Sequence, residues 1–235
     1  MLVLVGLGLH DEMDISLKGL EQIKKSGKVY AEVYTNLWKG DIKKLEELTG
    51  KEIIKVKRKD LENEIQKILE EAKIINVAIL VPGDPLVATS HYAILEEAKG
   101  IGIETKVIHA SSIFSAICET GIRITQLGQT ITIPLPKRTM GKLPKSVYEA
   151  IKENRKRKLK TLCLLDIDIE NDEFLSVSDA LKILLNLEEK FNEKVVSRLD
   201  QIIVFSDVGG SSEIFKGSIE NALKEDFELP SVIIL

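Results

Sequence analysis

The sequence predicts an α/β protein of two domains. Over residues 1–110, strand-sized apolar runs alternate with amphipathic helical segments, an order typical of a mostly parallel sheet with right-handed crossovers. The pattern then changes, and residues 111–235 predict a second α/β domain with a mixed sheet. A stiff loop, PGDP at residues 82–85, follows one of the apolar runs, at the end of a strand where ligands bind in open α/β sheets.

Composition excludes several classes of protein. The 235 residues are 44% hydrophobic and 30% charged with a net charge of −4, so no basic field attracts nucleic acid or a membrane surface. The apolar runs are too short to span a bilayer, and residues 1–6 predict a strand rather than a signal peptide. We therefore expect a cytoplasmic protein that binds neither membrane nor nucleic acid directly.

The cysteines and histidines do not form a recognisable site. Cys118 and Cys163 are far apart in apolar surroundings, which predicts two buried, reduced packing residues. The three histidines lack the spacing of metal ligands, so we expect no metal.

The elements of the first domain follow in order. Strands are predicted at residues 3–5, 29–34, 53–56, 74–80 and 104–108. Ser16 is expected to cap a helix whose apolar face includes Leu17, and Asp41 to cap a helix at 42–49 that ends at Gly50. Asp60 is expected to open one long amphipathic helix, and a further helix is predicted at 92–98.

The second domain is predicted to begin with a helix capped by Ser111 or Ser112. A β-like stretch at 123–133 follows, broken by Gly128 in the manner of a hairpin or bulge. Helices are then predicted at 146–156 and, opened by Ser178 and Asp179, at 180–191. Strands are predicted at 161–166, 201–206 and 231–235.

The glycine turn GLGL at residues 6–9 begins like a dinucleotide-binding fingerprint, with Glu32 near the place of a ribose-binding acid. However, Asp11 stands where the third glycine belongs, and Glu12 and Asp14 follow. These carboxylates would repel a pyrophosphate, so the pattern disfavours a dinucleotide and tolerates a ligand with positive charge.

Two other patterns have a functional and a plain interpretation. Thr89 and Ser90 beside His91 could suggest a nucleophile, but adjacent residues entering a helix diverge, and helix capping is the plainer role. The basic run NRKRKLK at 154–160 is interpreted first as a solvated helix end, and second as a contact for an acidic or RNA-associated partner.

Several strings together resemble one family. GLGL with Asp11, Glu12 and Asp14, YAEVYT at 30–35, PGDPLVAT at 82–89, HASSI at 109–113 and LLDI at 164–167 occur in the order found in diphthine synthases, the archaeal-type enzymes of the tetrapyrrole methylase fold. The resemblance covers nearly the whole chain.

This resemblance implies two domains, 1–110 and 111–235, with a cleft between them for S-adenosylmethionine, which leaves as S-adenosylhomocysteine, usually in a homodimer. It implies trimethylation of the amino group of the 3-amino-3-carboxypropyl-histidine of elongation factor 2. Matching motifs assign cofactor contacts to the following residues: Leu9, Asp84, Val87, Ser112, Ile113, Leu165, Val208 and Val232.

Methyl transfer from a sulfonium needs neither a metal nor a covalent intermediate, and no residue is predicted to be catalytic. The alternatives are a tetrapyrrole or RNA methylase of the same fold, or a cofactor-binding homologue without turnover. Relatives continue beyond the position of Leu235, so the second domain is expected to be shortened, with one wall of the pocket affected.

Overall fold

The structure is a computed structural model that describes residues 1–235. The chain divides into two compact units, Met1–Ser115 and Ala116–Leu235, and each is described by itself. None of the helices is long and apolar enough to cross a membrane.

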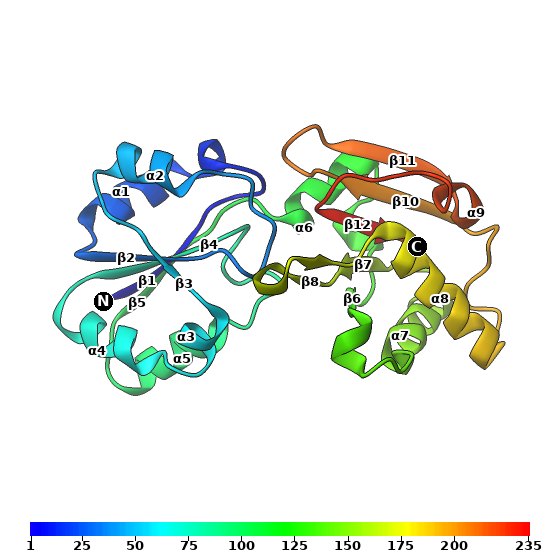
Figure 1. The fold of residues 1–235 in the computed structure, drawn as a ribbon, viewed down its shortest axis with the longest axis horizontal. Helices are drawn as coiled ribbons and strands as arrows, with labels where there is room; N and C mark the ends of the chain where they lie inside the picture. Colours follow the sequence, from blue (N-terminus) through cyan, green and yellow to red (C-terminus); the bar gives the residue numbers. More distant parts are fainter. The chain divides into compact units, whose positions relative to one another are not determined.

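The first unit is built on a five-stranded parallel sheet, as predicted (Figure 1). Its strands are β1 (Leu2–Gly6), β2 (Lys28–Glu32), β3 (Ile54–Val56), β4 (Val77–Val81) and β5 (Thr105–Ile108). They lie in the order β3-β2-β4-β1-β5. β1 and β4 are buried throughout, because helices cover both faces of the sheet.

Five helices form the two outer layers, α1 (Leu17–Lys25), α2 (Ile42–Thr49), α3 (Arg58–Glu62), α4 (Gln66–Ile74) and α5 (Tyr92–Gly100). α1 and α2 pack on one face with Val3 and Val5, whereas α3, α4 and α5 pack on the other with Leu2 and Leu4 (Figure 1). Side chains alternate along a strand, so β1 supplies both cores. Right-handed crossovers explain the two layers: the chain moves outward from β1 to β3 over one face and returns over the other.

The helix starts in the first unit are partly as predicted. Ser16 caps α1, Asp41 caps α2, and Gly50 ends α2 in the left-handed conformation. Leu17 is 82% exposed, however, so its assignment to the apolar face of α1 was wrong. The single helix expected from Asp60 is two helices, α3 and α4. Asp60 lies inside the first turn of α3, where its carboxylate accepts a hydrogen bond from the Lys57 N–H.

The second unit contains a mixed five-stranded sheet, again as predicted. Its strands are β6 (Ile131–Ile133), β7 (Leu162–Leu165), β10 (Gln201–Ser206), β11 (Glu213–Ser218) and β12 (Ser231–Ile234). The order is β11-β10-β12-β7-β6, with β6 parallel to β7 and the other pairs antiparallel. Helices α7 (Lys145–Lys156) and α8 (Val177–Phe191) pack on the sheet around the fully buried Tyr148 and Leu184. Short elements complete it: α9 (Ile219–Ala222) and the hairpin of β8 (Ile167–Asp168) with β9 (Glu173–Phe174). The short helix α6 (Ile113–Ala116) lies mostly in the first unit and contains its last residue, Ser115.

The β-like stretch at 123–133 is mostly not a strand. Residues Ile124–Gln126 form a 3-10 helix, and only Ile131–Ile133 pair in the sheet. Gly128 is packed against Asn154 of α7, where a β-carbon would lie 2.1 Å from the Asn154 Oδ1. The glycine is therefore explained by this close approach rather than by a hairpin.

Two further expectations for the second unit were wrong, and one strand was not predicted. α8 begins before Ser178, because Ser176 caps it by accepting from the Asp179 N–H. The sequence did not predict β11, which follows the glycine turn at 209–212. Cys118 is exposed, since it lies in a short 3-10 helix at the surface, and only Cys163 is buried.

Candidate functional site

Three loops of the first unit meet at the carboxyl edge of its sheet. β1 lies between β4 and β5, and the chain leaves β1 toward β2 but leaves β4 toward β5. The connections after β1 and β4 therefore run in opposite directions along the sheet, which is the arrangement that places a ligand site at this edge in α/β sheets. These loops and the loop after β5 carry Leu9, Asp84, Val87, Ser112 and Ile113, so the structure brings the five predicted site residues of this unit to one edge.

Backbone contacts join the first two loops. The Gly8 N–H donates to the Gly83 carbonyl at 3.3 Å, and the Gly83 N–H donates to the Gly8 carbonyl at 2.7 Å. A β-carbon on Gly6 would lie 2.6 Å from the Ala110 Cβ and 2.7 Å from the Gly83 carbonyl oxygen. All three loops are therefore packed at backbone distance, and the glycines make that approach possible.

Asp84 joins the second loop to the third. Its Oδ1 accepts from the Leu86 N–H at 3.0 Å, and its Oδ2 accepts from the Ala110 N–H at 3.2 Å and lies 2.8 Å from the His109 Nδ1. The side chain is buried, whereas that of His109 is 67% exposed. Asp84 thus has a structural role in holding the loops, whatever contact it makes with a ligand.

The other predicted site residues of this unit lie in the loops that Asp84 joins. Leu9, Val87 and Ile113 are half-buried, and Ser112 is buried. Ser112 immediately precedes α6, and its N–H donates to the Ser115 hydroxyl at 2.9 Å. Three apolar side chains at the surface of the loops can cover an aromatic ligand.

Local structure accounts for the acidic residues after Gly8. Asp11 caps a short 3-10 helix (Glu12–Asp14), and Asp14 accepts from the His10 N–H at 2.7 Å. Glu12 lies 2.7 Å from Lys44 Nζ, and this contact lowers the pKa of the carboxyl to about 2. These carboxylates brace the glycine turn, and they leave it without the positive field that a pyrophosphate requires.

The predicted residues of the second unit lie at one end of its sheet. Leu165 ends β7, Val208 follows β10, and Val232 is near the start of the antiparallel strand β12 between them. Val232 pairs with Leu164 and Phe205, so these three face one side of the sheet. Leu165 instead packs toward the core of α7 and α8. The structure therefore brings the three positions together but turns the Leu165 side chain to the opposite face.

Sequence reasoning missed a buried pair beside the central loop. Glu32, at the end of β2, is fully buried, and its Oε1 lies 3.4 Å from the His91 Nε2. Burial raises the pKa of Glu32 to about 7 and lowers that of His91 to about 4. The sequence places Glu32 near the position of a ribose-binding acid, a role that the acidic residues after Gly8 disfavour, and it gives no sign of the contact with His91.

The residues beside His91 do not form a catalytic triad. Thr89 Oγ1 donates to the Pro85 carbonyl at 2.6 Å, and it is 3.4 Å from the His91 N–H. α5 has no side-chain cap, so the capping role expected for Thr89 or Ser90 was wrong.

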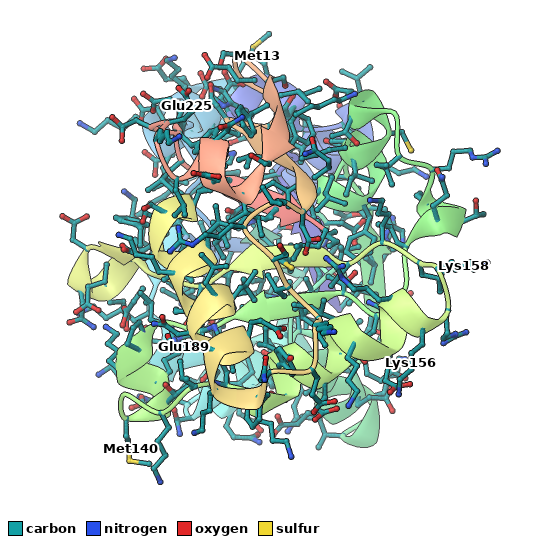
Figure 2. The ribbon with its side chains drawn as sticks, turned by 90° about the vertical axis from the view of Figure 1, so that its right-hand side faces the viewer. Met13, Met140, Lys156, Lys158, Glu189 and Glu225 are labelled. Atoms are coloured by element: carbon teal, nitrogen blue, oxygen red, sulfur yellow. The ribbon has the colours of Figure 1, made fainter.

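The basic run at 154–160 is partly neutralised. Arg155 bonds Asp200 at 2.6 Å, and Lys156 bonds Glu153 at 2.6 Å. Lys156 and Lys158 are exposed and point outward at the surface (Figure 2). Cations in the last turn of α7 also interact favourably with the helix dipole, so the run has a structural explanation.

Comparisons with known proteins agree with this architecture. The family model described as Tetrapyrrole (Corrin/Porphyrin) Methylases matches residues 1–222. The two sheets and the loop site define the class: this is an α/β methylase of the tetrapyrrole methylase fold.

Relatives narrow the class to one branch. Diphthine synthase of Methanocaldococcus jannaschii is 41% identical over 234 residues, and that of Methanococcus aeolicus is 40% identical over 232; each alignment covers 98% of this chain and 90% of the relative. A crystal structure of diphthine synthase, 33% identical, superposes with a TM-score of 0.88 over 100% of this chain and 88% of that chain. The chain belongs to the diphthine synthase family.

Proposed function

We propose that the protein transfers methyl groups from S-adenosylmethionine to the amino group of the 3-amino-3-carboxypropyl-histidine of elongation factor 2, forming a trimethylammonium. The observation that carries the proposal is the meeting of the loops after β1, β4 and β5 in a chain of this family. S-adenosylhomocysteine is the expected product, and a homodimer is the expected assembly.

The residues of the first unit fit this cofactor. Gly83 has a φ of +69°, and nothing lies within 4 Å of the place where its β-carbon would be, so this side of the loop is open to a ligand. Leu9, Val87 and Ile113 offer apolar surface beside it. The nearby carboxylates suit a sulfonium cation better than a diphosphate.

The second unit is proposed to contribute Leu165, Val208 and Val232. Val208 and Val232 are buried, and Leu165 is half-buried at the end of β7. Because the Leu165 side chain packs into its own core, we propose that its backbone rather than its side chain contacts the cofactor.

The bound cofactor supplies a methyl group already activated by the positive sulfur. The role of the protein is then to orient the reactants, which accounts for several kcal/mol of a typical barrier. Apolar side chains exclude water from the site, and Asp84 holds the loops in place. An amine with a pKa of about 8 is roughly a tenth neutral at pH 7, so no strong general base is required.

The direct test combines binding and turnover. Calorimetry should detect S-adenosylmethionine binding but no binding of NAD. Labelled methyl donor should then transfer label to elongation factor 2 that carries the unmethylated intermediate. Mass spectrometry of the modified histidine counts the methyl groups, with three expected.

Two alternatives predict different outcomes. Binding without label transfer, beside an active relative as control, would favour a cofactor-binding homologue without turnover. Transfer of label to a tetrapyrrole or to RNA, but not to elongation factor 2, would favour a methylase of the same fold with another substrate.

A further inference from the structure

The Glu32–His91 pair lies beside the loop proposed to bind the cofactor. Glu32 ends β2, which is hydrogen-bonded to β4, and His91 closes the loop that begins at Pro82. Oε1 of Glu32 accepts from the Thr35 hydroxyl at 2.7 Å, and Oε2 accepts from the Thr35 N–H at 3.3 Å. The Tyr34 backbone also hydrogen-bonds the carboxylate, and Oε1 lies 3.4 Å from the His91 Nε2.

Burial disfavours the charged form of both members of the pair, and the Pro85 backbone also hydrogen-bonds His91. Burial raises the pKa of Glu32 and lowers that of His91, so both side chains are neutral between about pH 4 and 7. The charge of Arg58 opposes part of the rise for Glu32, but Arg58 is itself bonded to Glu62 at 3.1 Å. Glu97, on α5, lines the same side of the loop and is bonded to Gln66.

One side of the loop faces an open cavity. A cavity of about 380 Å³ opens beside His91, and it is lined by Tyr34, Leu61, Glu62, Ser90, His91, Ala93, Ile94 and Glu97. The contact between Glu32 and the buried His91 therefore lies beside a face of the loop that packing leaves partly open.

The loop between Asp84 and His91 is strained. Ala88 has a φ of +56°, in the left-handed region that a residue with a β-carbon adopts only when its surroundings hold it there. Asp84 ties one end of this segment to the loop after β5, and His91 ties the other end to β2. Val87, half-buried, lies between the two ties.

We propose that Glu32 is a positioning residue: through His91 it holds residues 86–90 in the conformation that presents Val87, and it thereby sets the affinity for S-adenosylmethionine. This inference rests on the proposed function, because it takes the loop to be a cofactor site. It assigns Glu32 no contact with cofactor or substrate.

The test compares Glu32→Ala and Glu32→Gln with a matched control, Glu71→Ala. Glu71 bonds Lys28 Nζ at 2.5 Å and the Tyr30 hydroxyl at 2.6 Å near the other end of β2, so its loss lowers stability without reaching the loop. We expect Glu32→Ala to weaken S-adenosylmethionine binding at least tenfold by calorimetry. Glu32→Gln keeps one acceptor oxygen for Thr35 and places a neutral donor toward His91, so it should stay within threefold of the unaltered protein. Glu71→Ala should melt earlier but bind normally.

The inference and the proposed function fail differently. No binding by the unaltered protein would defeat the proposed function. Normal binding by Glu32→Ala, or an equal loss in Glu71→Ala, would overturn the inference alone. Action through His91 also requires that Glu32→Ala add nothing further when His91→Ala is already present, whereas additive losses would overturn it.

A spectroscopic readout covers the case in which Glu32→Ala does not fold. Infrared difference spectra should show a protonated carboxyl band that disappears near pH 7 and is absent from Glu32→Gln. Saturating S-adenosylmethionine should shift the midpoint of that titration, because it stabilises one arrangement of the loop. A midpoint unmoved by the cofactor would contradict the coupling.

Discussion

The Asp84 carboxylate lies 2.8 Å from the His109 Nδ1 and so bridges the loops after β4 and β5, two strands that follow one another along the chain but are separated in the sheet by β1. The same oxygen accepts from the Ala110 N–H. A buried acceptor shared by two loops makes their spacing depend on one side chain, and a ligand that contacts both loops depends on it as well.

Asp84→Ala should therefore weaken S-adenosylmethionine binding by more than tenfold. It leaves the Leu86 and Ala110 N–H groups without their acceptor, and an unsatisfied buried donor costs about 1–3 kcal/mol. Asp84→Asn keeps one acceptor oxygen, so its affinity for S-adenosylmethionine should fall less than that of Asp84→Ala. Calorimetry and thermal melting of both variants check this, and unchanged affinity in Asp84→Ala would limit Asp84 to making the turn.

Gly83→Ala and Gly50→Ala form a matched pair of substitutions. Both glycines have positive φ, +69° and +66°, and neither has an atom within 4 Å of the added β-carbon. Each substitution should lower the free energy of unfolding by about 1–2 kcal/mol, because alanine is disfavoured in the left-handed backbone conformation. Only Gly83→Ala places a methyl group in the space proposed for the cofactor, so it alone should weaken binding. Equal affinities in calorimetry would place the cofactor elsewhere.

The sequence predicted the parts of the fold that depend on local pattern. The continuous apolar run at 74–80 predicts a strand buried on both faces, although β4 begins only at Val77 because Ile74 ends α4 and is exposed. Ser16 and Asp41 predict helix starts through their own hydrogen bonds. The stretch at 123–133 failed because its β-like composition carries no information about Asn154, which is distant in the chain.

The site was predictable to a similar degree. Motif strings located the loops after β1, β4 and β5, because each string follows an apolar strand. The Glu32–His91 pair was not predictable, since it depends on β2 lying next to β4, and sheet order is a tertiary property. The direction of the Leu165 side chain depends in the same way on the register of β7.

Acid should unfold the protein partly through Glu12. Its pKa falls from the ordinary 4.5 to about 2, chiefly because Lys44 donates to the carboxylate. The stability that this contact contributes is present above pH 4.5 and is lost as pH falls toward 2. Glu12→Gln should therefore be less stable at pH 7, and its melting temperature should fall less between pH 5 and 3.

The control for Glu12 is Glu64→Gln. Glu64 also pairs with a lysine, Lys67, but this pair lies at the surface, where ion pairs contribute little. Its melting curves should follow those of the unaltered protein at each pH. If Glu12→Gln follows them as well, the Lys44 contact does not stabilise the glycine turn.

Gly128→Ala should destabilise the second unit selectively. A β-carbon there would lie 2.1 Å from the Asn154 Oδ1. The Asn154 side chain cannot easily yield, because it is buried and bonds the backbone of Gln129 and the Thr161 hydroxyl. Overpacking of this kind costs about 1–3 kcal/mol.

Trp38, the single tryptophan, belongs to the first unit, so its fluorescence reports that unit, whereas circular dichroism reports both. In urea, Gly128→Ala should bring forward a transition seen by circular dichroism and leave the tryptophan transition in place. Gly100→Ala, which meets no atom within 4 Å, should move neither transition to lower urea. If both signals of Gly128→Ala shift together, the two units unfold as one cooperative body rather than separately.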